Sequence, residues 1–183
     1  MNHHDMTRNM VLAALFAALT AIGAFLQIPT GTVPITLQFL FTALAGLLLG
    51  WKWGAISQLL YVGIGLLGLP VFTQGGGIGY VLQPSFGFLL GLIPAAAVIG
   101  ALTARRTGYL TVLAAVLVGD LILYAVGVPY MYLILHVYMQ SAKTFPALLA
   151  AMLVYVPGDT LKIIVVTALA PVLRRTLVKA VPN

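Results

Sequence analysis

Long apolar runs cover most of this chain, and short stretches that contain proline, glycine or charged residues separate them. The runs are close to the roughly 20 residues that an α-helix needs to cross a bilayer. They are continuous, whereas strands of an outer-membrane barrel alternate apolar and polar positions, so a barrel is excluded. The pattern predicts six transmembrane helices, over residues 9–28, 34–51, 54–72, 84–104, 108–126 and 157–178.

The segment between the last two of these helices, residues 129–156, is apolar but is interrupted by Lys143 and Pro146. We expect short external or re-entrant helices there. The first apolar run has the length of a full span and lacks a small-residue cleavage site, which predicts a retained helix rather than a signal peptide. Residues 1–183 are therefore expected to form a single transmembrane domain of six helices.

The composition indicates an all-α integral membrane protein. Hydrophobic residues make up 62% of the chain and charged residues only 7%, whereas about 25% of the residues of a soluble domain are charged. The absence of cysteine excludes disulfides and thiolate metal sites. His3 and His4 are adjacent on a short tail and His136 has no ligand at helical spacing, so we expect neither a metal ion nor a cofactor.

Most of the cations lie in connections that the helix pattern places on one side of the membrane. These cations are Arg8, Lys52, Arg105, Arg106, Arg174, Arg175 and Lys179. The opposite connections carry only Lys143. Because Lys and Arg mark cytoplasmic loops, this distribution predicts that both termini are cytoplasmic. It also explains the net charge of +6 without a nucleic-acid partner.

Two charged residues near the start of the last predicted helix, Asp159 and Lys162, have no such explanation. At a spacing of i and i+3 they share a helix face and can neutralise each other. Asp159 precedes Arg174 by fifteen residues, about 22 Å of helix, which places it in the outer third of the membrane. Asp159 is either a first-turn acid stabilised by the helix dipole, with a lysine that reaches the interface, or half of a pair that faces a polar solute entering from outside.

Asp120 is the third charged residue inside a predicted helix. It is a further member of the site, a partner for Lys162, or a packing acid bonded to a neighbouring helix. We expect a supporting role rather than direct contact with a solute.

Three connections reach the same predicted outer face as Asp159. They are residues 30–38, the glycine-rich residues 73–88, and the tyrosine-containing segment 129–156. The glycines at 75, 76, 77 and 79 allow the backbone to approach a ligand closely or to move as a lid. Polar side chains and mobile glycines thus converge on one face, which favours a pocket there.

Ala13, Ala17 and Ala21 recur every fourth residue in the first predicted helix. Small residues at this spacing permit close approach of two helices. The stripe predicts either packing within the chain's own bundle or a docking face for another membrane protein.

Motifs of several enzyme classes are absent. The chain has no Walker A sequence, so it does not bind ATP by that route. The aspartates at 120 and 159 suggest an intramembrane aspartyl protease as an alternative, but such proteases carry Gly-x-Gly-Asp, and V-P-G-D (156–159) lacks the first glycine. Lys162 beside Asp159 also disfavours the proton that the two carboxyls of a protease dyad share.

Five motifs occur in the same order as in one known family. They are V-P-I-T-L-Q (33–38), L-L-Y-V-G-I-G-L-L-G-L-P-V-F (59–72), the glycine run (75–79), Q-P-S-F-G-F-L-L-G (83–91) and P-G-D-T-L-K (157–162). Together they span nearly the whole chain, which resembles the BioY family, the biotin-binding S components of energy-coupling-factor (ECF) transporters. The resemblance implies a multi-pass protein of a bacterial or archaeal cell membrane, surrounded by lipid, that captures biotin near the outer face. It also implies a transmembrane T component and two ABC-type ATPases as partners, with the alanine stripe as the docking surface.

The resemblance further implies which residues contact biotin. Asp159 and Lys162 would hold the ureido ring, because a carboxylate accepts from N–H groups and an ammonium donates to a carbonyl. The valerate chain would point outward past residues 30–34. The other candidates are Thr32, Val33, Gln38, Tyr80, Gln83, Ser85, Phe86 and, in a supporting role, Asp120.

One motif departs from the family pattern. Many relatives have Gly-Pro-Thr-Gly-Gly-Tyr where this chain has Gln-Pro-Ser-Phe-Gly-Phe at 83–88. We interpret the chain as a biotin-capture subunit without catalytic activity of its own. The alternatives are an S component for another vitamin, a self-sufficient secondary transporter, and the protease.

Overall fold

A computed structural model of the chain describes residues 3–30, 32–105 and 108–179, and the side chains within residues 5–174 of these ranges. Its α-helices and β-strands, in order, are α1 (His3–Phe25), β1 (Gln27–Ile28), β2 (Ile35–Thr36), α2 (Gln38–Leu66), α3 (Phe86–Leu102), α4 (Tyr109–Leu133), α5 (Phe145–Ala151) and α6 (Val156–Lys179). Short helical turns cover Ile78–Leu82, Ile134–Tyr138 and Met152–Val154. The chain is therefore mostly helical, as the sequence predicts.

Four helical stretches are long and apolar enough to cross a membrane: Asp5–Phe25, Gln38–Leu66, Tyr109–Tyr138 and Val156–Arg174. Helix α3 is apolar but shorter, with 17 residues, about 25 Å. Only 33–44% of the residues in the most apolar part of each long stretch are buried within the chain. The rest of this apolar surface matches a lipid environment, which confirms a multi-pass membrane protein.

The helices predicted at 34–51 and 54–72 correspond to α2, which breaks at Gly50. Gly50 has φ 79° and ψ 178°, a conformation that is essentially restricted to glycine. The chain folds back sharply there, since a Cβ built on Gly54 would lie 2.8 Å from the Cα of Gly46. The second half ends at Leu66, earlier than predicted, and the chain then turns at Gly68 with φ 109°.

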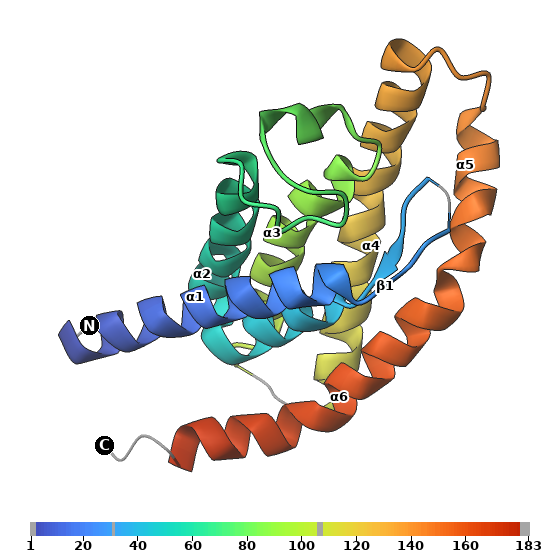
Figure 1. Cartoon of the computed structure of the whole chain (residues 1–183). Helices are drawn as coiled ribbons and strands as arrows, with labels where there is room; N and C mark the ends of the chain where they lie inside the picture. Colours follow the sequence, from blue (N-terminus) through green and yellow to red (C-terminus); the bar gives the residue numbers. More distant parts are fainter. Residues whose placement is uncertain (1–2, 31, 106–107, 180–183) are drawn as a thin grey trace.

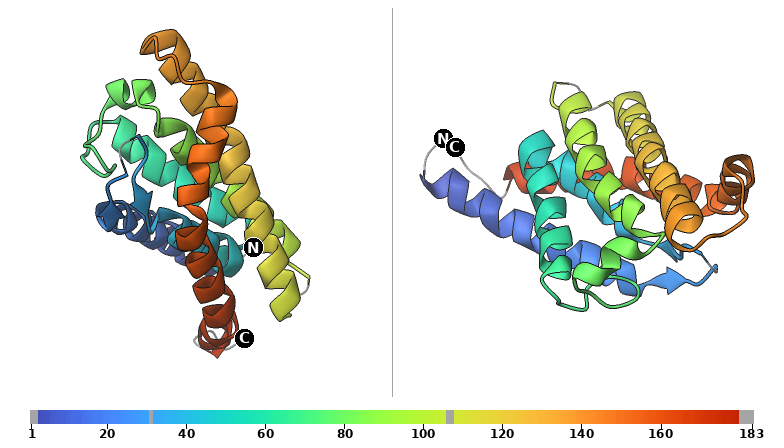
Figure 2. Two further views of the ribbon diagram at one scale, coloured as in Figure 1. Left: turned by 90° about the vertical axis from the view of Figure 1, so that its right-hand side faces the viewer. Right: turned by 90° about the horizontal axis from the view of Figure 1, so that it is seen from above.

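Helix α3 packs between α2 and α4, while α1 lies across α2 and α6 packs against α4 and α2 (Figure 1). Figure 2 shows the long rod of α5 and α6 along one side of this bundle. The strands β1 and β2 form a small antiparallel hairpin in which Gln27 pairs with Thr36 and Ile28 with Ile35. The hairpin follows α1 and lies beside the start of α6, and this position decides where the site forms.

The segment 129–156 is partly an extension of a helix. Helix α4 continues past the predicted end at residue 126, through Pro129, and closes with the π-helical turn Ile134–Tyr138. A π turn widens the helix locally. Short helices follow, as predicted, at Phe145–Ala151 and Met152–Val154. The prediction of short helices is thus correct only for the second half of the segment.

The alanine stripe predicted as a docking face lies largely inside the molecule. Ala13 is fully buried and Ala17 is 5% exposed, and both pack within the bundle, while Ala21 is half-buried. The small residues that α1 exposes are instead Ala14 and Ala18. Of the two readings of the stripe, packing within the bundle is the one that the structure supports.

Arg174 has a structural role that its position in the sequence does not indicate. Its guanidinium donates to the carbonyl of Leu47, with Nη2···O 2.7 Å and Nε···O 3.2 Å, and to the carbonyl of Thr103 at 3.3 Å. These carbonyls lie at the break of α2 and at the end of α3. Lys52 and Arg105, both exposed, follow these same points in the chain. Arg106 and the side chains of Arg175 and Lys179 lie outside the described parts of the structure.

Replacement of Gly46 by alanine is expected to destabilise the protein, because the new Cβ would lie 2.4 Å from the carbonyl oxygen of Ala96 in α3. Overpacking of this kind costs roughly 1–3 kcal/mol. Gly63→Ala in the same helix is the matched control, since its Cβ meets nothing within 4 Å. Thermal unfolding in detergent should show a lower midpoint for Gly46→Ala and an unchanged or higher one for Gly63→Ala. Equal midpoints would contradict the close packing of α2 on α3.

Candidate functional site

A buried ion pair forms at the beginning of α6. Lys162 Nζ lies 2.5 Å from Asp159 Oδ1, and the two residues are only 7% and 6% exposed. Pro157 and Asp159 both fall in the first turn of α6, where proline is tolerated and a negative charge is favoured. The helix start therefore positions the carboxylate, and the i, i+3 spacing brings the ammonium to it.

Two other elements complete the coordination of this pair. The hydroxyl of Tyr124, from α4, donates to Asp159 Oδ2. Lys162 Nζ donates to the backbone carbonyl of Thr36, from β2, at 3.3 Å. Each charge thus has a hydrogen-bond partner besides the opposite charge, which a buried ion pair requires.

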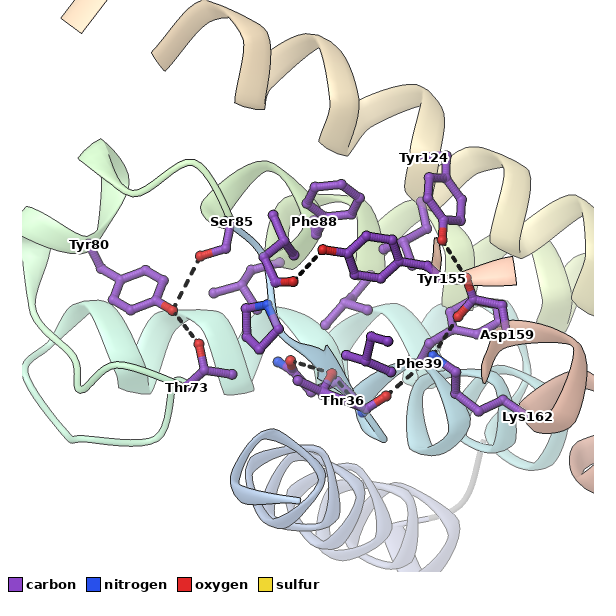
Figure 3. A pocket seen from close by; sticks show the side chains of 17 residues that line it. Thr36, Phe39, Thr73, Tyr80, Ser85, Phe88, Tyr124, Tyr155, Asp159 and Lys162 are labelled. Carbon is purple, nitrogen blue, oxygen red and sulfur yellow. Dashed lines mark hydrogen bonds and ion pairs between the residues drawn. The ribbon is translucent and has the colours of Figure 1, made fainter. Parts of the chain in front are cut away.

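A cavity opens beside the ion pair, between the hairpin, α2, α3, α4 and the start of α6 (Figure 3). The space between its side chains, including the open solvent at its mouth, is about 600 Å³. Its polar lining residues are Thr36, Gln38, Thr73, Tyr80, Ser85, Tyr124, Tyr155, Asp159 and Lys162. Its apolar lining residues are Val33, Pro34, Ile35, Phe39, Phe88, Leu89, Leu92 and Leu123.

A second polar group lies at the opposite end of the cavity from the ion pair (Figure 3). The hydroxyl of Tyr80 hydrogen-bonds Thr73 Oγ1 at 2.8 Å and Ser85 Oγ at 3.4 Å. Tyr80 stands on the short helical turn Ile78–Leu82, which Gly77 introduces with φ 99°. This positive φ is the point at which the glycine-rich connection needs a glycine.

Gln38 fixes the wall of the cavity between these two ends. Its Nε2 donates to the hydroxyl of Tyr61 at 2.8 Å, and its Oε1 accepts from Thr36 Oγ1 at 2.9 Å. Tyr61 in turn donates to the carbonyl of Val71. Because both ends of the amide are bonded, the side chain holds one orientation.

Aromatic rings supply the apolar part of the lining. The rings of Phe88 and Tyr124 meet edge to face, with centroids 6.0 Å apart and planes at 89°. Phe39, from the first half of α2, is buried and lines the cavity as well. A flat, partly apolar solute can pack against these rings while its polar atoms reach the ion pair.

The connection between β1 and β2 is tied to the chain that leads into α6. Tyr155 donates from its hydroxyl to the carbonyl of Val33 and hydrogen-bonds Thr30 Oγ1 at 2.8 Å. Thr30 Oγ1 also donates to the carbonyl of Val33. These polar contacts join Thr30 and Val33 to Tyr155, and Val33 and Tyr155 both line the cavity.

The cavity brings together six of the residues predicted from the sequence, namely Asp159, Lys162, Val33, Gln38, Tyr80 and Ser85. It does not include Gln83, Phe86, Thr32 or Asp120. Gln83 ends the turn that carries Tyr80 and is half-buried away from the cavity.

Phe86 and Thr32 were predicted to contact the solute but do not line this cavity, for different reasons. Phe86 is buried behind the cavity wall, where its ring packs between Tyr80 and Tyr130 with centroids 6.4 and 5.8 Å away. Phe88, two positions later on α3, takes the place in the lining. Thr32 lines a second cavity, nearer the tip of the hairpin.

Asp120 lies one turn before Tyr124 on α4. Its Oδ1 is buried and has no hydrogen-bond partner in the described part of the chain. The residue lies outside the lining of the cavity, and Tyr124, one turn later, contacts Asp159.

Sequence reasoning missed Tyr124, Tyr155, Thr36 and Thr73. Two of them could have been found from their spacing to a charged residue, because Tyr124 follows Asp120 by four residues and Tyr155 precedes Asp159 by four. Residues four apart lie on one helix face. Thr36 and Thr73 carried none, since their positions depend on the fold of two connections.

Comparisons with known proteins agree with this geometry. A family model described as the BioY family matches residues 1–179. The probable biotin transporter BioY of Lysinibacillus sphaericus is 54% identical over 141 residues, which are 76% of this chain and 72% of that protein. The biotin transporter BioY of Thermotoga maritima is 35% identical over 164 residues, which are 89% of this chain and 94% of that protein.

A solved structure has the same fold. It is the crystal structure of the S-component for biotin from an ECF-type ABC transporter, with a TM-score of 0.84 and 30% sequence identity. The match covers 96% of this chain and 95% of the other. The chain therefore belongs to the BioY family.

The ion pair is expected to behave as one energetic unit. Asp159→Leu and Lys162→Met should each destabilise the protein, because the remaining charge stays buried without its partner, at a cost of roughly 3–5 kcal/mol. The double variant should be destabilised by less than the sum of the two. Thermal unfolding of the four proteins in detergent gives the coupling, and additive losses would contradict a mutually neutralised pair.

Proposed function

We propose that this chain binds biotin and delivers it across the cell membrane as the S component of an ECF-type ABC importer. The buried pair Asp159–Lys162 at one end of a cavity that polar and apolar side chains line together is the observation that carries the proposal. The family membership and the names of its relatives support biotin as the solute.

The ion pair has the chemistry that a cyclic urea needs. The carboxylate of Asp159 accepts hydrogen bonds from the ureido N–H groups, and the ammonium of Lys162 donates to the ureido carbonyl. The pair has no net charge, so a neutral ring system binds without leaving an ion unpaired. Tyr124 holds the carboxylate from the side of α4, and it joins the ligand-binding residues in this proposal.

The rest of the cavity accommodates the bicyclic ring and the start of the acid chain. Phe39 and Phe88 pack against the rings, while Gln38, Tyr80 and Ser85 offer hydrogen bonds along the walls. Val33 and Tyr155, which also line the cavity, lie where the acid chain of biotin would leave it. Phe86 and Asp120 support this lining from behind, and Gln83 is given no ligand contact.

We further propose six membrane crossings with both termini cytoplasmic. The two halves of α2 on either side of Gly50 count as separate crossings, with α1, α3, α4 and α6 as the others. The contacts of Arg174 with the break of α2 and the end of α3 support one cationic end of the bundle, which Lys52 and Arg105 share.

The partners in this proposal are a transmembrane T component and two ABC-type ATPases, because the chain has no Walker A motif of its own. The exposed alanines of α1, Ala14 and Ala18, replace Ala13, Ala17 and Ala21 as the docking face. Small exposed residues four apart allow a partner helix to approach closely.

The proposal includes no catalytic activity. Both oxygens of Asp159 are engaged, one by Lys162 and one by Tyr124. Asp120 lies outside the cavity lining. This arrangement disfavours the proton shared between two carboxyls on which an aspartyl protease depends.

Calorimetric titration of the purified chain with biotin tests the central proposal. Asp159→Asn and Lys162→Met should each weaken binding by about tenfold to a hundredfold, because each removes a charge-assisted hydrogen bond worth about 1.5–3 kcal/mol. Lys52→Met is the matched control at an exposed lysine and should bind as the parent does. Thiamine and riboflavin should give no heat of binding. Tight binding of another vitamin instead of biotin would contradict the assignment of the solute.

If α1 is the docking face, a bulky substitution on it should block assembly with the partner subunits without changing the affinity for biotin. Ala18→Trp should greatly reduce co-purification with the co-expressed T component and ATPases while biotin affinity stays unchanged. Ala114→Trp, at an exposed alanine of α4, is the control and should assemble normally. Assembly that survives Ala14→Trp and Ala18→Trp would exclude this face.

A further inference from the structure

A second cavity lies outward from the ion pair, between the tip of the hairpin, the end of α4 and α5. Its space, counting its mouth, is about 750 Å³. Thr30 and Thr32 line it from the hairpin, Leu148 and Met152 from the rod of α5 and α6, and Lys143 from the connection before α5. We call it the outer cavity and the space beside Asp159 and Lys162 the inner cavity.

The two cavities lie in line along one face of the rod. Leu148, Met152, Tyr155, Asp159 and Lys162 follow one another at spacings of three or four residues, and the first three line the outer cavity while the last three line the inner one. Tyr155 belongs to both. Asp159 follows Leu148 by eleven positions, about 16 Å at the α-helical rise. Tyr155 is thus the side chain that an elongated solute would pass to reach from one cavity into the other.

The outer cavity has the chemistry of an anion site with an apolar approach. The ammonium of Lys143 lines this cavity. Within the described part of the chain it forms no ion pair, because the salt bridge found there joins Asp159 and Lys162. None of the chain's three acidic residues lines the cavity. The hydroxyl of Thr32 adds a hydrogen-bond donor, and those of Thr30 and Tyr155 line the cavity while they donate to the carbonyl of Val33. Leu148 and Met152 flank them with apolar surface.

The orientation of the chain leaves Lys143 without a topological role. The other cations outside α6 lie at the opposite end of the predicted topology, where they mark the cytoplasmic side. An unpaired ammonium at a cavity that leads to the binding site needs a different explanation, and a negatively charged ligand group supplies one.

We propose that the outer cavity holds the carboxylate at the end of the solute whose ring occupies the inner cavity. Lys143 pairs with this carboxylate and the hydroxyl of Thr32 donates to it, joined by that of Thr30 once it releases the carbonyl of Val33. The chain thereby selects a free acid over the corresponding amide or ester. This inference rests on the proposed function and adds to it a residue that determines specificity.

Binding of biotin and of uncharged biotinamide to the purified chain tests the inference. The parent should bind biotin about tenfold more tightly than biotinamide, the effect of one charge-assisted hydrogen bond of moderate strength. Lys143→Met should lower the affinity for biotin to that for biotinamide and leave the latter unchanged. Lys52→Met, at an exposed lysine elsewhere, should keep the tenfold preference. Added salt should weaken the binding of biotin and not that of biotinamide.

Three results would overturn the inference, and each is distinguishable from failure of the proposed function. Equal affinities of the parent for acid and amide would exclude a carboxylate site, and equal weakening of both ligands by Lys143→Met would show a merely structural lysine. A headgroup phosphate of an anionic lipid has similar chemistry. If Lys143→Met leaves the acid-to-amide ratio unchanged but reduces retention of phosphatidylglycerol in nanodiscs, the outer cavity is a lipid site. Absence of any biotin binding would instead refute the proposed function, and the inference with it.

Discussion

The ion pair between Asp159 and Lys162 is the constraint around which the site is built. Two opposite charges inside an apolar bundle are tolerated only if each finds its partner and further hydrogen bonds. Tyr124 and the carbonyl of Thr36 provide these bonds, and they come from α4 and β2. Helix α6 can therefore bury the pair only where α4 and the hairpin meet it, and the inner cavity forms at this junction.

Buried polar groups extend from this junction into the packing of the bundle. Thr36 accepts from Lys162 through its carbonyl and donates from its hydroxyl to Gln38. The carbonyl of Gln38 accepts from Thr42, which also donates to Gln58, and Gln58 contacts Thr20 of α1. Each of these groups depends on its neighbours for its hydrogen bonds, so the cavity wall is rigid. The helix that exposes Ala14 and Ala18 is thus joined to the same polar core as the ion pair.

The sequence was sufficient for the features that polarity determines, and insufficient for those that depend on helix rotation. Intramembrane charges are rare, so Asp159 and Lys162 stood out, and breaks in the apolar runs located most of the helices. Ala13 and Ala14 could not be told apart, because buried and lipid-facing positions are equally apolar in a membrane helix. The same ambiguity explains why Phe86 was predicted to contact the solute, although its ring packs between Tyr80 and Tyr130. The extension of α4 through Pro129 was missed because proline usually ends a helix in a soluble protein, whereas membrane helices tolerate it.

Neutrality of the ion pair has a consequence for how such a site can select its solute. A site whose charges cancel recognises a ring by the pattern of its donors and acceptors and is indifferent to net charge, so a charged tail has to be recognised elsewhere. The mouth of the inner cavity is the place where this becomes possible, since the connection over it is held by hydroxyl and carbonyl groups of Thr30, Val33 and Tyr155. Hydrogen bonds at a solvated mouth contribute little net stability, about 0.5–1.5 kcal/mol each. They can be exchanged for bonds to an incoming carboxylate at small cost, which rigid apolar packing at the same place would not allow.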